Sequence, residues 1–409
     1  MAQPNSTNTP KKIFLIDNVI IGNNHLVINS SMIRIAENLI PDHSPKISFF
    51  GEKRHLSVLK GLASDSEVRQ VHFRPIDVIN PKRGWIPKVL SWTLKLLLDF
   101  FWLGKIIRLA HRKDIEYVIF TTIIPINLLL FVSIFNRKSE LKFMVLLHGD
   151  IEYIFKERPS RSERIKAYLL KSAFRRSRNN IKYVVLSDHI KGSLINSYSL
   201  KESQVFSVDH PIINVNTKAM SKKRYLQFSH LGVANGRKNS GLIFPLAKSL
   251  ASLVLDGKAR FSIIGRLDIP GINITDSIVE IEAKSNEPID NIKYKSLIEE
   301  ADYSLIFMSE KEYVFRISGS LLDSLQFKIP IIALKHPAIL ELFSKGGDIG
   351  FVCDNLDEMK LVIKEICKPN SAYAERYEGQ VNNLEQLSNQ FSAKSATLKF
   401  QDSIQGWNV

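Results

Sequence analysis

Short apolar runs alternate with helical stretches along almost the whole chain. In the first half the runs have the length of buried strands, and the residues between several of them place apolar side chains at helical spacing. Strands that alternate with helices indicate a parallel sheet covered by helices, so the pattern predicts an α/β fold. The predicted strands of the first half are residues 12–17, 47–50, 71–73, 117–122, 143–147, 183–187 and 205–208.

The alternation of apolar runs and helical stretches is interrupted by a basic stretch at residues 212–224 and then resumes. A chain of 409 residues is long enough for two domains of ordinary size. We predict an N-terminal domain at 11–213, a linker at 214–224 and a C-terminal domain at 225–385, with residues 1–10 disordered. The predicted strands of the second domain are residues 226–231, 261–265, 278–283, 303–308, 331–334 and 346–352.

Residues 85–112 are strongly apolar but carry five interspersed basic residues and three tryptophans. A basic, tryptophan-rich amphipathic helix is typical of binding to a membrane surface. The alternative is a helix packed on the sheet with one solvated side. Charges recur too often for a transmembrane span, and residues 117–135 are better explained as a strand, a turn at Pro125 and a helix. A long basic helical stretch at 157–182 adds to the same positive surface.

The net charge of +15 belongs almost wholly to the first half. Residues 1–213 hold 32 Lys and Arg against 18 Asp and Glu, a balance of +14, whereas residues 214–409 hold 24 against 23, a balance of +1. Such a field attracts an anionic membrane, an anionic glycan or a nucleic acid. No nucleic-acid motif is present, so we expect no nucleic-acid partner. Only two cysteines and a polar start without a signal peptide predict a cytoplasmic protein.

The stretch 303–334 has the pattern strand, loop, helix, strand. Ser318 and Gly319 open the helix, where free backbone N–H groups and the helix dipole favour an anion such as phosphate. Arg316, just before the helix, has the geometry to bind phosphate oxygens with two N–H groups. Asp323, one turn further, is placed to accept hydrogen bonds from sugar hydroxyls. The alternative is an ordinary crossover in which Ser318 is merely a helix cap.

Three motifs of the second half resemble those of GT-B glycosyltransferases of the family-4-like, or group 1, kind. Residues 321–323 (LLD) stand at the family's LLE, and residues 328–333 (KIPIIA) stand at its GxPVIA. Residues 232–239 (GVANGRKN) are similar to its glycine turn, in which a basic pair reaches the donor diphosphate. The second acid is Asp323 instead of Glu, and Glu310 and Glu312 lie further from it than the family's spacing.

The resemblance implies an α/β fold of two Rossmann-like domains facing a central cleft, with a C-terminal helix at 386–409 that returns to the first domain. It implies that the second domain binds a nucleotide-sugar and the first an acceptor. The implied donor-binding residues are Gly232, Arg237, Lys238, Gly265, Arg316, Ser318, Gly319 and Asp323. The implied catalytic residues are His148, Asp150, Glu310 and Glu312, and the implied acceptor-binding residues are Asn23, Asn24 and His25.

A transferase of this kind moves a sugar from a nucleotide-sugar donor to a glycan or lipid-linked acceptor, as in surface polysaccharide or lipopolysaccharide biosynthesis. We expect it on the inner face of an anionic membrane. The chain has no Asp-x-Asp motif, and Asp150-Ile151-Glu152 is a poor substitute, so no metal or other cofactor is expected. A sugar-nucleotide epimerase and a non-catalytic nucleotide- or glycan-binding protein are the alternatives. The donor, the acceptor and the stereochemistry stay open.

Overall fold

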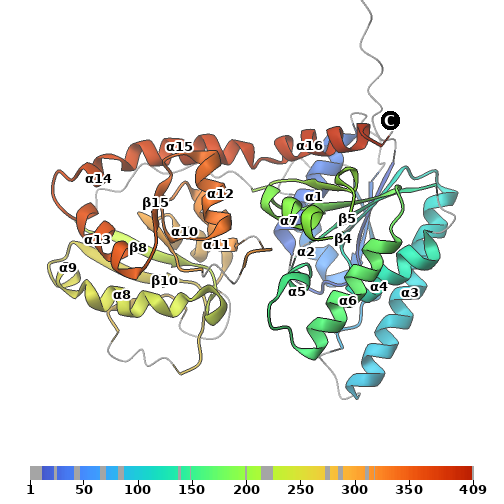
Figure 1. Ribbon diagram of the computed structural model, residues 1–409, viewed down its shortest axis with the longest axis horizontal. Helices are drawn as coiled ribbons and strands as arrows, with labels where there is room; N and C mark the ends of the chain where they lie inside the picture. The colour runs from blue at the N-terminus through green and yellow to red at the C-terminus, as the bar shows by residue number, and fades with distance from the viewer. Residues whose placement is uncertain are drawn as a thin grey trace, which may run out of the picture. The chain divides into compact units, whose positions relative to one another are not determined.

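The chain folds into two compact units (Figure 1). Unit one comprises the chain up to Pro211 together with the segment from Ala393 to the end, and unit two comprises Ile212–Ser392. The computed structural model describes residues 12–22, 25–40, 47–64, 71–81, 87–136, 140–147, 149–198, 200–212, 224–271, 277–283, 289–308, 313–316 and 318–407.

Unit one is built on a seven-stranded parallel sheet in the order β3-β2-β1-β4-β5-β6-β7. Every residue of β1 and β4 is buried, as expected for central strands that are covered on both faces. The strand order reverses between β1 and β4, which pair directly, and such a reversal is where parallel α/β sheets bind ligands. The strands are β1 (Ile13–Asp17), β2 (Ile47–Glu52), β3 (Val71–Ile76), β4 (Tyr117–Thr122), β5 (Lys142–Leu146), β6 (Ile181–Val185) and β7 (Val205–Ser207).

Helices cover this sheet, and the last of them comes from the C-terminal end of the chain. That helix, α16 (Ala393–Gln405), packs against α1. Beyond it Trp407 donates through Nε1 to the carbonyl of Asn179 at 2.8 Å. The other helical elements are α1 (Leu26–Leu39), α2 (Lys53–Ser64), α3 (Lys88–Arg112), α4 (Pro125–Leu130), the π-helical turn η1 (Phe131–Phe135), α5 (Glu152–Phe155), α6 (Arg161–Arg176), α7 (Asp188–Ser197) and the short turn η2 (Glu202–Gln204).

Unit two holds a six-stranded parallel sheet in the order β12-β10-β8-β13-β14-β15 and a small pair, β11-β9. Alternate residues of β13 enter two separate apolar clusters, since Tyr303 and Leu305 join one and Ile306 joins the other. The sheet is therefore buried on both faces. The strands are β8 (Leu226–Leu231), β9 (Ala234–Asn235), β10 (Ala259–Ile264), β11 (Leu267–Asp268), β12 (Val279–Ile281), β13 (Tyr303–Ile306), β14 (Ile331–Leu334) and β15 (Gly350–Cys353).

The helices of unit two flank its sheet (Figure 1). They begin with two short 3-10 turns that follow β9 directly along the chain. The helical elements are η3 (Gly236–Lys238), η4 (Ser240–Leu242), α8 (Ile243–Ser249), α9 (Ala251–Leu255), α10 (Asn291–Ile298), α11 (Gly319–Phe327), α12 (Pro337–Gly346), α13 (Leu356–Ile366), α14 (Ala372–Glu375) and α15 (Tyr377–Gln390).

Two boundaries predicted from the sequence are wrong. The strand expected at 346–352 begins only at Gly350, because α12 runs to Gly346 and ends where Gly347 adopts a positive φ of 67°. The basic helix expected over 157–182 ends at Arg176, and Lys182 is a buried residue of β6. None of the helices in the described ranges is long and apolar enough to cross a membrane.

Candidate functional site

In unit two, two glycines bring backbone segments together at the carboxyl ends of β8 and β10. Gly232 has a φ of +77° and Gly265 a φ of +146°, both in the region that favours glycine. A Cβ atom on Gly265 would lie 2.0 Å from the carbonyl oxygen of Gly232, a distance that no side chain tolerates. The close approach thus requires glycine at position 265 and fixes the loop that follows β8.

A network of short hydrogen bonds holds the turn after Gly232 against the sheet. Asn235 caps η3 by accepting from the backbone N–H of Lys238 at 3.1 Å. The Ser240 hydroxyl accepts from the Asn235 N–H at 3.1 Å and bonds Nε2 of the buried His230 at 3.0 Å. Burial lowers the pKa of His230 to about 4, so a neutral ring joins this turn to the sheet through the Leu305 carbonyl, 3.2 Å from Nδ1.

This turn directs the ammonium group of Lys238 inward, toward the start of α11. Lys238 Nζ donates to the hydroxyl of Ser320 at 3.1 Å, and that hydroxyl donates to the Leu231 carbonyl at 2.6 Å. Lys238 is only 8% exposed. Burial lowers its pKa to about 8, and the nearby carboxylate of Asp323 opposes the shift. Lys238 is therefore a buried cation whose charge depends on pH near neutrality.

Asp323 lies on the same side of α11, one turn after Ser320. The phenol of Tyr294, from α10, donates to its Oδ2 at 2.7 Å. Burial raises the pKa of Asp323 to about 6, while the Tyr294 hydrogen bond and the charge of Lys238 hold it down. Among the described residues no donor reaches Oδ1, so one oxygen of the carboxylate stays available as an acceptor.

The first turn of α11 has several features of an anion site. Ser318 is the N-cap residue, but its side chain makes no capping bond, and its hydroxyl is buried without a hydrogen-bond partner among the described residues. A Cβ atom on Gly319 would meet no heavy atom within 4 Å. Free backbone N–H groups, the positive end of the helix dipole and an unused hydroxyl are the features that bind phosphate.

The two predicted arginines are less buried than Lys238. Arg237 is exposed, and its guanidinium carbon lies 5.7 Å from the ring centre of Tyr313. Tyr313 has a positive φ of 63°, and its carbonyl accepts from the backbone N–H of Arg316 at 3.2 Å. Arg316 is half-buried. The predicted catalytic residues Glu310 and Glu312 lie outside the described residues.

In unit one, His25 stands beside the point where the order of the strands reverses. It precedes α1 with a φ of +56°, and its Nδ1 lies 3.4 Å from the hydroxyl of Thr122 at the end of β4. Burial first, and then the charges of His55 and His210, lower the pKa of His25 to about 4. His25 is therefore neutral at physiological pH, and a neutral ring can both donate and accept a hydrogen bond.

A buried polar network supports the loop that carries His25. Asp17 accepts from the side chain of Asn29 at 2.7 Å, and the same Asn29 nitrogen lies 2.8 Å from Nε2 of His55. His55 Nδ1 in turn lies 2.6 Å from the carbonyl of Gly22, to which it donates. Three elements, β1, α1 and α2, are thus tied together beneath the loop.

The other predicted residues of unit one follow β1 and β5. Asp150 is half-buried just after β5, and Glu152 is the first residue of α5. His148, Asn23 and Asn24 lie outside the described residues.

Two functional candidates escaped the sequence analysis. Ser320 joins Lys238 to the end of β8, and Tyr294 orients Asp323. Ser320 had a detectable signal, because it lies two residues after the N-cap Ser318, in the first turn of the predicted helix. Tyr294 had none, because only the packing of α10 against the sheet brings its phenol near α11.

The sequence matches no protein-family model and no curated protein. Solved structures are nevertheless similar over nearly the whole chain. A glycosyltransferase from Rickettsia africae has a TM-score of 0.61 and 14% identity over 96% of this chain and 97% of that chain. A variant of S. aureus TarM, in complex with fondaparinux, α-GlcNAc-glycerol and UDP, has a TM-score of 0.60 and 12% identity over 98% and 100%. The N-terminal domain of trehalose-6-phosphate phosphatase from Candida albicans has a TM-score of 0.58 and 11% identity over 100% and 99%.

At these identities the similarity shows the fold. The predicted α/β fold with two Rossmann-like domains, shared with solved glycosyltransferases, is confirmed. Because the same fold also occurs in a domain of a phosphatase, the function has to be argued from the site.

Proposed function

We propose that this protein is a glycosyltransferase that uses a nucleotide-sugar donor. The observation that carries the proposal is the cluster at the start of α11, where the Lys238 ammonium, the open helix N-terminus and the Asp323 carboxylate stand together in unit two. A cation beside a helix N-terminus suits a diphosphate, and a carboxylate one turn away suits the hydroxyls of a ribose.

Each group has a definite task in the transfer. As the bond between the sugar and the diphosphate breaks, negative charge grows on the departing nucleotide. Lys238, the N–H groups of the first turn of α11, Arg237 and Arg316 stabilise that charge. Because these groups are already cationic or dipolar, the proposed reaction does not require a metal. Asp323 accepts a ribose hydroxyl through Oδ1 while Tyr294 holds Oδ2.

The acceptor and the remaining catalytic groups are proposed from the sequence resemblance. His148 and Asp150 would act on the donor sugar and the acceptor hydroxyl, and Glu310 or Glu312 would contact the donor sugar. Asn23, Asn24 and His25 would bind the acceptor. The S. aureus TarM complex holds UDP and a sugar-substituted glycerol, which supports a nucleotide donor and a glycan acceptor.

We further propose that the acceptor is a glycan or lipid-linked sugar at the inner face of an anionic membrane, as in the biosynthesis of a surface polysaccharide. The excess of positive charge in residues 1–213 supports this location, because a cationic domain gathers anionic lipid and glycan.

A thermal-shift screen against UDP-, GDP- and CMP-sugars tests donor binding at low cost. We expect at least one nucleotide-sugar to stabilise the wild type, and Arg316→Ala to lose most of that shift. Hydrolysis or transfer of the sugar from the selected donor, measured with and without membranes, then separates an enzyme from a protein that only binds nucleotides. The absence of a shift with every nucleotide would count against the proposal, and a shift without turnover would favour a binding protein.

A further inference from the structure

The outward side of α3 carries a stripe of exposed side chains that are apolar in the first turns and cationic in the last turns. Leu90, Leu94, Leu97 and Phe101 recur at spacings of four, three and four residues, so they lie on one side of the helix. Each is exposed, Leu97 by 63% and Phe101 by 54%. The same side continues into the last turns with Lys105, Arg108 and Arg112, which are also exposed. We call these seven residues the α3 stripe.

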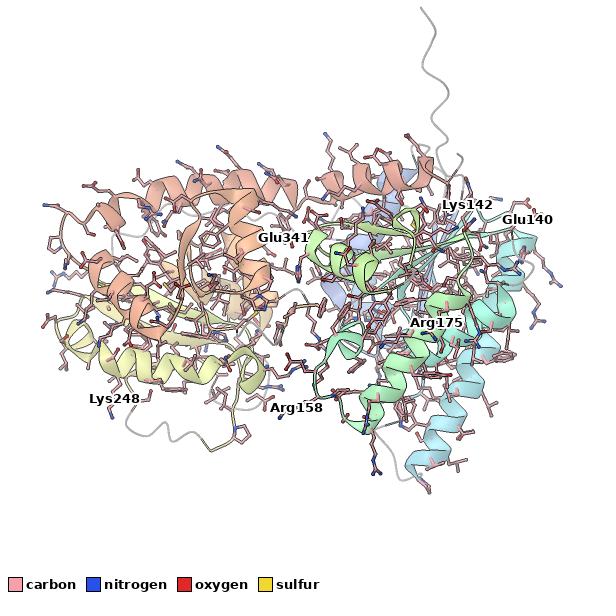
Figure 2. All side chains as sticks on the ribbon, viewed as in Figure 1. Glu140, Lys142, Arg158, Arg175, Lys248 and Glu341 are labelled. Atoms are coloured by element: carbon pink, nitrogen blue, oxygen red, sulfur yellow. The ribbon has the colours of Figure 1, made fainter. Side chains whose placement is uncertain are left out.

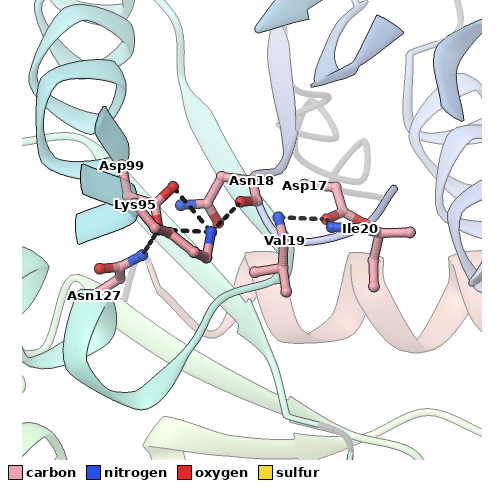
Figure 3. Close-up of polar contacts among 7 residues, drawn as sticks. All are labelled: Asp17, Asn18, Val19, Ile20, Lys95, Asp99 and Asn127. Carbon is pink, nitrogen blue, oxygen red and sulfur yellow. Dashed lines mark hydrogen bonds and ion pairs between the residues drawn. The ribbon is translucent and has the colours of Figure 1, made fainter. Parts of the chain in front are cut away.

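The opposite side of α3 packs against the rest of unit one through buried contacts. The α3 stripe is therefore the solvent-facing side of the helix within unit one. Lys95 and Asp99 form a buried ion pair at 2.9 Å. Asn127 of α4 donates to Asp99 at 2.6 Å, and Lys95 donates to the carbonyl of Asn18 after β1 at 3.4 Å (Figure 3). A buried pair with these partners fixes which side of the helix faces inward, because turning the helix would separate the pair from Asn127 and from the Asn18 carbonyl.

Aromatic packing holds the middle of the helix in the same orientation. The rings of Phe100 and Phe135 lie 5.0 Å apart. Gly104 leaves room for Phe135, since a Cβ atom there would lie 3.1 Å from that ring. Beside this contact Ile134 of η1 is 49% exposed and enlarges the apolar surface.

The cations of the α3 stripe are not neutralised. Lys105, Arg108 and Arg112 form no ion pair with another described residue. Lys105 instead lies 4.5 Å from the ring centre of Trp102, and Arg108 donates to the carbonyl of Gly104. Their positive charges are therefore available to an anionic partner. They add to the excess of +14 that residues 1–213 carry.

We propose that the α3 stripe is a docking surface for an anionic lipid membrane, with Leu94, Leu97 and Phe101 in the headgroup–acyl boundary and the cations on the lipid phosphates. Exposed apolar side chains followed by cations are the features of a helix that lies in a membrane interface. A second copy of the stripe is a poor partner, because it would set three cations against three cations or against apolar side chains. This inference deepens the membrane part of the proposed function by naming the surface.

The test is cosedimentation of the full chain with vesicles of phosphatidylcholine containing one third phosphatidylglycerol, and with pure phosphatidylcholine. We expect binding to the anionic vesicles that weakens with added salt, and little binding to the neutral ones. Replacing Lys105, Arg108 and Arg112 together by Gln should weaken binding about a hundredfold. Leu97→Ser with Phe101→Ser should weaken it at least about tenfold without changing the charge.

Matched control variants make the same kinds of substitution at exposed positions of unit two. Leu255 and Leu361 are exposed leucines, and their double replacement by Ser should leave vesicle binding unchanged. The triple replacement by Gln of the exposed residues Lys248 (Figure 2), Lys295 and Lys364 controls for net charge. Circular dichroism and thermal unfolding confirm that each variant is folded.

Three results would overturn the inference: no binding to either vesicle, equal losses in the matched controls, or concentration-dependent self-association that Leu97→Ser abolishes. The readout needs no donor, so its failure is separable from a failure of glycosyl transfer. A protein that binds vesicles but no nucleotide would retain the docking surface and lose the proposed reaction.

Discussion

The carboxyl ends of the two parallel sheets carry polar clusters of opposite character. In unit one, Asp17, Asn29 and His55 bond one another and the backbone and so join β1, α1 and α2, although Oδ1 of Asn29 has no partner among the described residues. In unit two, Lys238 and Asp323 have pKa values shifted toward neutrality by burial, and the Ser318 hydroxyl has no partner among the described residues. Hydrogen bonds that join three elements support a loop, whereas buried ionisable groups with shifted pKa values beside an unpartnered hydroxyl are typical of a site that a ligand completes.

The largest expected effect comes from Gly265→Ala. The added methyl would lie 2.0 Å from the Gly232 carbonyl, so the loop after β8 must move. We expect a loss of about 3 kcal/mol or more in the free energy of unfolding, measured by urea denaturation. Gly379→Ala is the matched control, because its Cβ would meet nothing within 4 Å in a helix. Equal stability of the two variants would contradict the close approach.

Asn29→Leu tests whether the network of unit one is structural. It removes the donor that Asp17 Oδ2 and His55 Nε2 share and leaves that ring nitrogen without a partner among the described residues, so we expect a loss of about 2–3 kcal/mol in the free energy of unfolding. Nucleotide affinity, measured by calorimetry below the unfolding transition, should stay at the wild-type value. A selective loss of nucleotide affinity with normal stability would place the donor site in unit one instead.

Lys238→Met is the corresponding change in unit two. It removes a buried cation at little cost in packing, so we expect the affinity for the nucleoside diphosphate found in the screen to fall about 10- to 100-fold. The stability of the unliganded protein should hold or rise, because burying an ammonium group is unfavourable. Lys248→Met, on the surface of the same unit, should change neither quantity.

The pH dependence of nucleotide binding tests whether the charge of Lys238 contributes to affinity. The free protein keeps Lys238 protonated below its pKa of about 8 and loses that charge above it. Affinity for a nucleoside diphosphate should therefore be steady between pH 7 and 8 and fall roughly tenfold for each further pH unit. Asp323, with a pKa of about 6, is already ionised across this window. Calorimetry should show a flat profile for Lys238→Met, and an equally steep one would assign the titration to another group.

Tyr294→Phe should have the smallest effect. The variant loses the 2.7 Å hydrogen bond to Asp323, which lets the pKa of that carboxyl rise and its orientation vary. We expect nucleotide affinity at pH 7 to fall about fivefold, in line with the loss of about 1 kcal/mol for one hydrogen bond. A ribose-free probe, inorganic pyrophosphate, should bind both proteins alike. An equal loss of affinity for pyrophosphate would show that Tyr294 supports binding of the diphosphate instead of the ribose.

Much of the fold followed from the alternation of apolar runs, because parallel strands buried on both faces form short continuous apolar segments. The crossover at 303–334 was predicted, and so was the start of its helix at Ser318. Both depend on residues that lie close together in the sequence. Helix α2 was not predicted, because its burial depends on contacts with α1, β2 and β3. The late start of β15 depends on Gly347, whose positive φ ends the preceding helix.

The site was less accessible to sequence reasoning. The basic pair at positions 237 and 238 is visible in the sequence, but its split into an exposed arginine and a buried lysine is not. That split depends on the contact of Lys238 with Ser320, which lies 82 residues further along the chain. The Tyr294–Asp323 bond likewise joins two helices that no local pattern connects.

The most direct test of the central claim is a crystal structure of the protein with the nucleoside diphosphate found in the screen. The account predicts that the diphosphate lies against the N–H groups of the first turn of α11, within hydrogen-bond distance of Lys238 Nζ and the Ser318 hydroxyl, with the ribose on Asp323. A nucleotide bound elsewhere, with Lys238 still bonded only to Ser320, would contradict it.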